Sequence, residues 1–282
     1  MDTRQRPVAL GKEAASYWQF TSTSLTPAHF YAANGFPVPA YRSLLTALAT
    51  HYSLTALDNR ALWPGQPRQP KHRIRCRQYA DDLVRFLDAT ASAPVVGMGH
   101  SMGATTTVMA AAARPDLFRS LVLIEPVLLS TWTAFLSQTL PARVQARLPL
   151  IDTTLSSPQC WADRAEAWQF YRSHRAYRCV PDEALEVLLD GLLEPADNAV
   201  RLAFSRQWEV ANYMGLDAVW RDLKRLRMPV KIIRARPSLF LPQTSWQRLQ
   251  RLLPDAEFID IPQQRHLLPM ENPTLTVESI VS

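Results

Sequence analysis

The chain has 282 residues, of which 47% are hydrophobic and 20% charged, and its formal net charge is +6. This balance is typical of a folded globular protein and argues against a disordered or membrane-spanning chain. The length suits one large α/β domain, or such a domain with an inserted subdomain.

Targeting signals, cysteines and charge narrow the class of protein further. The first seven residues lack the apolar core of a secretory signal, and no apolar run approaches the ~20 residues of a membrane helix, so we expect a cytoplasmic location and no membrane span. Cys76, Cys160 and Cys179 are widely spaced and form no C-x-x-C pair, which predicts neither a disulfide nor a metal site. The arginines are scattered without interleaved aromatic residues, so we expect no nucleic acid among the partners.

Short β-type runs alternate with longer helical stretches, and this alternation predicts an α/β fold with a mostly parallel, doubly wound sheet. The predicted strands are Tyr17–Thr21, Ala28–Ala32, Ser53–Leu57, Pro94–Met98, Ser120–Ile124, Pro229–Ile233 and Ala256–Ile261. The helices predicted between them are Tyr41–His51, Ile74–Thr90 and Ser101–Ala113.

Strand signals disappear between residues 127 and 227, where Trp-, Arg- and Leu-rich helical patterns replace them. The helices predicted there are Ala162–Tyr171, Asp182–Leu193 and Trp220–Leu226. We therefore predict a core made of residues 1–126 and 228–282, with residues 127–227 inserted as a helical cap or lid. An insertion at this place would lie above the carboxyl ends of the strands, where open α/β sheets bind their ligands.

The strongest local motif is Gly97-Met98-Gly99-His100-Ser101-Met102-Gly103, which links a predicted strand to an alanine-rich helix. It contains the pattern G-x-S-x-G. The glycines at 99 and 103 indicate a sharp turn in which side chains would collide and in which the serine backbone is strained. Such a turn exposes the Ser101 hydroxyl as a candidate nucleophile.

A dinucleotide-binding loop is the competing interpretation of the same glycines, because Glu125 follows about twenty residues later, where a ribose-binding acid would sit. Two observations favour the serine turn. The motif follows several earlier strands instead of opening the first βαβ unit, and its third glycine is one residue late for the commonest dinucleotide fingerprint.

A histidine near the end of the chain supports the interpretation of Ser101 as a nucleophile. His266 follows the last predicted strand, in the order nucleophile, acid, histidine that serine hydrolases with a G-x-S-x-G turn use. The other histidines, His29, His51, His72 and His174, lack such a context.

These motifs resemble those of the α/β-hydrolase superfamily, and the resemblance runs from about Tyr17 to Val277. Ser101 lies in a segment similar to the nucleophile elbow, and His266 with the following Pro269-Met270-Glu271 is similar to the catalytic histidine segment. Asn34-Gly35-Phe36-Pro37 is similar to the oxyanion loop, usually His-Gly-x-Pro. The resemblance implies an oxyanion hole made by the backbone N–H groups of Phe36 and Met102, and it implies no cofactor.

The acid of the triad is harder to place. Many members of the superfamily carry an aspartate after the strand equivalent to Pro229–Ile233, and this chain has no carboxylate there. We assign the acid to Glu125, at the end of the preceding strand, although a glutamate there also suits a structural salt bridge. His100 and Asn34 are candidate substrate-binding residues, and Arg265 stands where a glycine usually precedes the histidine.

The predicted function is hydrolysis of a carboxylic ester or thioester in a small molecule, through an acyl-enzyme on Ser101. Acyl transfer and carbon–carbon bond cleavage are alternatives on the same scaffold. A non-catalytic binding protein with this fold is an alternative from another class, suggested by the missing acid after Ile233 and by Arg265. Haloalkane dehalogenation requires a carboxylate nucleophile, which Ser101 excludes.

Overall fold

A computed structural model describes residues 3–20, 25–71 and 74–282. Thr21, at the end of one predicted strand, and His72 lie outside these ranges. No helix in the described part of the chain is long and apolar enough to cross a membrane.

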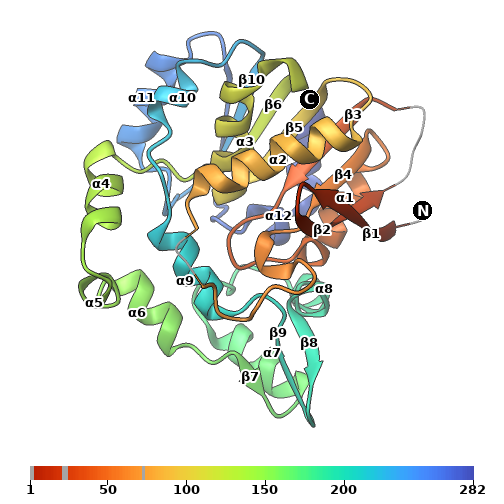
Figure 1. The fold of residues 1–282 in the computed structure, drawn as a ribbon, viewed down its shortest axis with the longest axis vertical. Helices are drawn as coiled ribbons and strands as arrows, with labels where there is room; N and C mark the ends of the chain where they lie inside the picture. The colour runs from red at the N-terminus through yellow and green to blue at the C-terminus, as the bar shows by residue number, and fades with distance from the viewer. Residues whose placement is uncertain (1–2, 21–24, 72–73) are drawn as a thin grey trace.

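The centre of the molecule is an eight-stranded sheet (Figure 1). Its strands are, in chain order, β1 (Thr3–Leu10), β2 (Glu13–Phe20), β3 (Pro27–Tyr31), β4 (Ser53–Leu57), β5 (Val95–His100), β6 (Phe118–Ile124), β10 (Val230–Arg236) and β11 (Glu257–Pro262). Their order in space is β1-β2-β4-β3-β5-β6-β10-β11. The strands from β4 to β11 run parallel, whereas β1 and β2 form an antiparallel hairpin at one edge.

Helices cover both faces of this sheet, which confirms the predicted fold class. The helices of the core are α1 (Arg42–Leu48), α2 (Cys76–Thr90), α3 (Met102–Ala113), α11 (Gln243–Leu252), α12 (Leu268–Glu271) and α13 (Pro273–Val281). Successive β-strand residues point to opposite faces. Met98 of β5 and Ile124 of β6 accordingly pack with α1, α12 and α13, whereas Leu121 and Leu123 of β6 pack with α2, α3 and α11.

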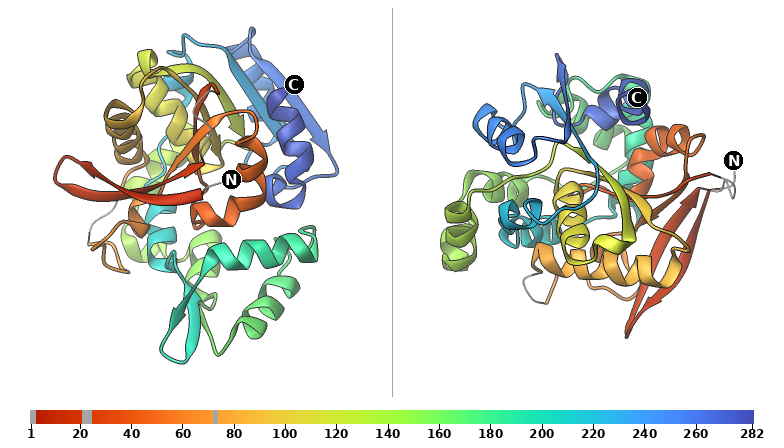
Figure 2. Two further views of the ribbon diagram at one scale, coloured as in Figure 1. Left: turned by 90° about the vertical axis from the view of Figure 1, so that its right-hand side faces the viewer. Right: turned by 90° about the horizontal axis from the view of Figure 1, so that it is seen from above.

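The segment between β6 and β10 is mainly helical, as predicted, but it also contains a small sheet that the sequence did not reveal. Its helices are α4 (Thr131–Thr139), α5 (Ala142–Gln145), α6 (Pro149–Ser156), α7 (Arg164–Ser173), α8 (Asp182–Leu192), α9 (Arg206–Met214) and α10 (Trp220–Leu223). Its three antiparallel strands are β7 (Cys160–Trp161), β8 (Leu193–Ala196) and β9 (Ala199–Leu202). Figure 2 shows that β8 and β9 project from the end of the molecule opposite the main sheet.

The strand order places the reversal of the sheet between β3 and β5. The chain adds β4 on one side of β3, and then β5 and the later strands on the other side. Open α/β sheets bind ligands in the crevice at the carboxyl ends of the strands where this reversal occurs. The loop after β3 and the turn after β5, which carry Phe36 and Ser101, lie at that point.

Candidate active site

Ser101 occupies a strained turn between β5 and α3. Its φ of 58° and ψ of −121° lie outside the regions that most residues adopt. A Cβ atom at Gly103 would lie 2.2 Å from the Tyr31 carbonyl oxygen, and one at Gly99 would lie 2.6 Å from the Ala104 nitrogen. The turn therefore tolerates only glycine at both positions, because α3 starts in contact with the end of β3.

Three side chains from distant parts of the chain form one line of hydrogen bonds at this turn. His266 Nε2 lies 3.0 Å from Ser101 Oγ, and His266 Nδ1 lies 3.1 Å from Glu125 Oε2. A carboxylate only accepts, so Nδ1 carries the proton and Nε2 is left to accept from the serine hydroxyl. The geometry matches that of a nucleophile, a base and an acid that orients the base.

Glu125 is completely buried at the end of β6, and its own backbone turns sharply, with a φ of 47°. Its Oε1 accepts from the Ala235 N–H at 2.9 Å, and its Oε2 accepts from the Ser238 hydroxyl at 2.7 Å as well as from His266. Three donors thus replace the water that the buried carboxylate has lost. Two of these donors, Ala235 and Ser238, come from β10 and the loop after it. This is the place where the sequence lacks the aspartate that many members of the superfamily carry.

The loop that carries His266 is closed by Glu271, which accepts a hydrogen bond from the Arg265 N–H at 2.8 Å. Burial raises the pKa of the Glu271 carboxyl above its usual value. The imidazole of His266 packs edge-on against Phe240, with ring centroids 4.5 Å apart, and lies 5.0 Å from the ring of His100. The His266 ring is therefore held between these two neighbouring rings and Glu125, and its loop is held by Glu271.

His100 is wholly buried, and both of its ring nitrogens bond to protein groups. Nδ1 lies 2.7 Å from the Tyr41 hydroxyl, and Nε2 lies 2.8 Å from the His266 carbonyl oxygen. Burial lowers the pKa of His100 well below its ordinary value, and the neighbouring His266 lowers it further. This environment does not support the expected substrate contact by His100.

Asn34 is also engaged by protein groups instead of facing an open site. Its Nδ2 donates to the Glu209 carbonyl at 2.9 Å, and its Oδ1 accepts from Asn212 Nδ2 at 2.8 Å. Both partners belong to α9, so Asn34 fastens the loop after β3 to the segment between β6 and β10. This arrangement therefore does not support direct substrate binding by Asn34. It supports a role for Asn34 in holding the loop after β3.

The two predicted oxyanion donors differ in their present partners. Met102 is the first residue of α3, so its N–H has no acceptor within the helix. The Phe36 N–H donates to the Ala33 carbonyl at 3.3 Å, across a turn in which Gly35 has a φ of 82°. Ser101 itself lies at the N-terminus of the twelve-residue helix α3, where the helix dipole favours negative charge.

The other described histidines and the cysteines belong to no metal-binding group. His29 is buried, and burial lowers its pKa to about 3. Within residues 3–20, 25–71 and 74–282, no group of three or more His, Cys, Asp or Glu side chains is placed to hold a metal ion. Among the aromatic residues between β6 and β10, Trp161 and Trp208 are buried in packing, whereas Trp132 is 67% exposed.

Comparison with known proteins identifies the family. The sequence profile of the alpha/beta hydrolase family matches residues 23–279. The chain is 25% identical over 250 residues to 2-(acetamidomethylene)succinate hydrolase of Mesorhizobium japonicum, covering 86% of this chain and 82% of that protein. It is 28% identical over 201 residues to lipase LipV of Mycobacterium tuberculosis, covering 68% of this chain and 69% of the lipase.

Solved structures show the same fold. A crystal structure of E-2-(acetamidomethylene)succinate hydrolase superposes with a TM-score of 0.81 at 22% identity, over 99% of this chain and 98% of that one. A thioesterase domain from the curacin biosynthetic pathway superposes with a TM-score of 0.76 at 16% identity, over the whole of both chains. Since the family profile spans almost the entire sequence and these structures share its fold, the chain belongs to the alpha/beta hydrolase family.

Proposed function

We propose that this alpha/beta hydrolase is a serine enzyme that cleaves carboxylic esters or thioesters of small molecules. Ser101 is the nucleophile, His266 the general base and Glu125 the acid. The observation that carries the proposal is the unbroken line from Ser101 Oγ to His266 Nε2 at 3.0 Å and from His266 Nδ1 to Glu125 Oε2 at 3.1 Å. No cofactor enters the reaction.

In the acylation step, Ser101 Oγ forms a bond to the substrate carbonyl carbon while its proton moves to His266 Nε2. Glu125 stabilises the resulting imidazolium through the Nδ1–H bond. The tetrahedral intermediate then collapses, and His266 gives its proton to the departing alcohol or thiol. A water molecule repeats the sequence on the acyl-enzyme, and its attack releases the acid and restores the Ser101 hydroxyl.

The negative oxygen of each intermediate is bound by the N–H groups of Phe36 and Met102. The Met102 N–H points out of the start of α3, with the helix dipole behind it. The Phe36 N–H exchanges its long 3.3 Å bond to Ala33 for a shorter, charge-assisted bond to the oxyanion. One such donor is worth about 3 to 4 kcal/mol of transition-state stabilisation.

Residues 127–227 form the cap in this proposal. Two contacts support it: α9 holds Asn34 of the oxyanion loop, and Thr105 of α3 donates to the Val127 carbonyl at 2.8 Å. Ser101 is only 6% exposed. In this proposal the residues above the strand ends enclose the substrate at Ser101 and set substrate choice.

A second candidate substrate class is an amide that carries carboxylates, such as 2-(acetamidomethylene)succinate. It is favoured by the relative of that name, which matches 86% of this chain. The net charge of +6 also favours attraction of an anionic substrate. Acyl transfer and carbon–carbon cleavage use the same serine and histidine, whereas a purely binding protein has no use for the aligned proton path.

The test is hydrolysis of p-nitrophenyl acetate and butyrate, and of 2-(acetamidomethylene)succinate, by the wild type beside Ser101→Ala and His266→Ala. We expect turnover of at least one substrate class, its loss in both variants, and labelling of Ser101 by a fluorophosphonate. Absence of both turnover and labelling in the wild type would refute the serine mechanism. If Ser101 is labelled and 2-(acetamidomethylene)succinate is cleaved but the esters are not, the second substrate class is selected.

A further inference from the structure

Three consecutive hydrogen bonds connect the oxyanion loop to the backbone of the general base. The Ala33 N–H donates to Tyr41 Oη at 3.0 Å, the Tyr41 hydroxyl meets His100 Nδ1 at 2.7 Å, and His100 Nε2 meets the His266 carbonyl oxygen at 2.8 Å. A carbonyl oxygen only accepts, so Nε2 of His100 carries the proton and Nδ1 accepts from Tyr41. Each donor and acceptor in this path is therefore used once.

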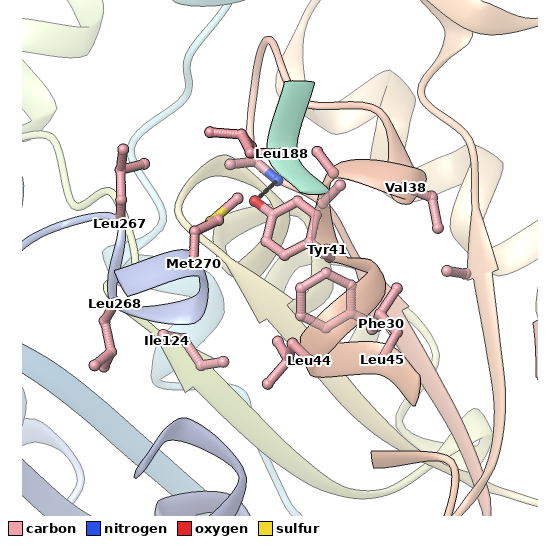
Figure 3. Packing of buried hydrophobic residues seen from close by; sticks show 14 of the residues in the cluster. Phe30, Val38, Tyr41, Leu44, Leu45, Ile124, Leu188, Leu267, Leu268 and Met270 are labelled. Carbon is pink, nitrogen blue, oxygen red and sulfur yellow. Dashed lines mark hydrogen bonds between the residues drawn. The ribbon is translucent and has the colours of Figure 1, made fainter. Parts of the chain in front are cut away.

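The surroundings of this path are apolar and closely packed. Tyr41 is 1% exposed and His100 is 0% exposed. Figure 3 shows the Tyr41 ring between Phe30 and the side chains of Leu188 and Met270, with its hydroxyl bonded as drawn by the dashed line. Buried polar groups without partners are costly, so each bond in such a place specifies a position as well as adding stability.

The ends of the path are the two parts that must be aligned for catalysis. Ala33 accepts the turn bond from the Phe36 N–H, and it immediately precedes the loop residues 34–36. At the other end, the carbonyl of His266 belongs to the residue whose ring bonds to Ser101. We propose that Tyr41 and His100 are positioning residues that lock the loop carrying Phe36 to the backbone of His266.

This inference rests on the proposed serine mechanism but concerns a different property of the site. The oxyanion donor and the base keep one relative position because two buried side chains join them. This link also explains why His100 stays uncharged beside His266, since a second imidazolium there would oppose protonation of the base. The identity of His100 in the serine turn is thereby accounted for without substrate contact.

The first experiment compares Tyr41→Phe with Tyr31→Phe. Tyr31 is a matched control, because it is equally buried and its hydroxyl has no hydrogen-bond partner among the described residues. We expect Tyr41→Phe to lower kcat about 10- to 100-fold with KM changed less than about threefold, since an oxyanion donor is displaced but not removed. Tyr31→Phe should leave both parameters unchanged.

A trifluoromethyl ketone separates positioning from general damage to the fold. Ser101 adds to its carbonyl carbon, the serine proton moves to His266, and the oxygen becomes an oxyanion in the hole. Its affinity should fall in Tyr41→Phe by the same factor as kcat/KM. A loss of kcat with unchanged ketone affinity, or equal effects in Tyr31→Phe, would overturn the inference. Urea unfolding of each variant shows whether the fold is intact.

Two replacements of His100 test the two halves of the path. Asparagine places an amide near the position of Nδ1 and keeps the bond to Tyr41, whereas glutamine places one near Nε2 and keeps the bond to His266. We expect each to retain more activity than His100→Leu, and His100→Leu to add little to Tyr41→Phe in a double-mutant cycle. Full additivity of the two substitutions would contradict a shared path.

A spectroscopic measurement keeps this inference separable from the proposed mechanism. In ¹⁵N-histidine NMR spectra, His100 should show the Nε2-protonated form and no titration between pH 5 and 8, and Tyr41→Phe should perturb its Nδ1 signal. An Nδ1-protonated or titrating His100 would refute the path even in an active enzyme. If the wild type has no serine activity but His100 shows the expected form, the serine mechanism fails and the path stands.

Discussion

Ser238 Oγ donates to Glu125 Oε2 at 2.7 Å, and the same hydroxyl accepts from the Leu241 N–H at 2.9 Å. The loop after β10 thus contributes a hydroxyl to Glu125, at the place where many members of the superfamily carry the acid itself. The carboxylate reaches the same imidazole from β6. In the proposed mechanism Ser238 therefore helps to hold Glu125, and Glu125 in turn orients His266.

Removing that hydroxyl should weaken the acid without removing it. In Ser238→Ala, Glu125 keeps the Ala235 N–H and His266 but loses its third donor, so we expect kcat to fall about 3- to 10-fold, the effect of one hydrogen bond of about 1 kcal/mol. Ser238→Thr keeps a hydroxyl and should retain most activity. Equal losses in the two variants, measured by ester hydrolysis, would mean that the loop shape matters and the hydroxyl does not.

Glu125→Gln tests the acid more directly. A glutamine amide can present an N–H to His266 Nδ1, which would place the imidazole proton on Nε2 and prevent that nitrogen from accepting from Ser101. We expect kcat to fall by about 10³ to 10⁴, as for the loss of the acid in serine proteases, with KM little changed. Circular dichroism and urea unfolding should show a folded protein. A near wild-type kcat would remove Glu125 from the mechanism.

The sequence predicted the core strands and the serine turn because their signals are local. Glycines at 99 and 103 mark the turn within a few residues, and buried parallel strands are continuous apolar runs. Ser238 and Tyr41 carried no such signal, since a serine in a loop and a tyrosine at a helix start are common. Their roles arise only when the fold brings them to Glu125 and His100, which are 113 and 59 residues away in the chain.

The strands that the sequence missed have physical reasons of their own. β1 is exposed along most of its length and contains Arg4, Gln5 and Arg6, so its sequence shows no alternation of apolar and polar residues. β7 has two residues, and β8 and β9 have four each, which is too short for a period of two to be recognised.

Gly103→Ala should damage both the stability and the activity of the protein. The added Cβ would lie 2.2 Å from the Tyr31 carbonyl oxygen, so α3 must move away from β3 and carry Ser101 with it. We expect a loss of about 2 kcal/mol or more in the free energy of unfolding, and loss of fluorophosphonate labelling. Gly65→Ala is the control for a glycine that has no close contact: Gly65 has a positive φ, unlike Gly103, and no atom lies within 4 Å of its added Cβ. It should cost about 1 kcal/mol and leave labelling intact. Equal effects of the two substitutions would mean that the contact with β3 does not explain the need for glycine at position 103.

The buried His29 should make the stability of the fold depend on pH. Burial lowers its pKa to about 3 in the folded state, against about 6.5 in the unfolded chain. Between these values the unfolded chain binds a proton that the folded protein does not, so the free energy of unfolding falls as the pH is lowered. From pH 7 to pH 5 this contribution changes by about 2 kcal/mol. His29→Gln keeps an acceptor for the Leu57 N–H, which His29 Nε2 accepts at 3.1 Å, but it cannot titrate. Urea unfolding at pH 7 and pH 5 should therefore show a drop in stability that is about 2 kcal/mol smaller in the variant than in the wild type. The contributions of all other titrating groups are the same in both proteins, so they cancel when the two drops are subtracted. The same pH dependence in both proteins would mean that His29 is protonated in the folded state, and that the apolar packing around it opens to admit a charge.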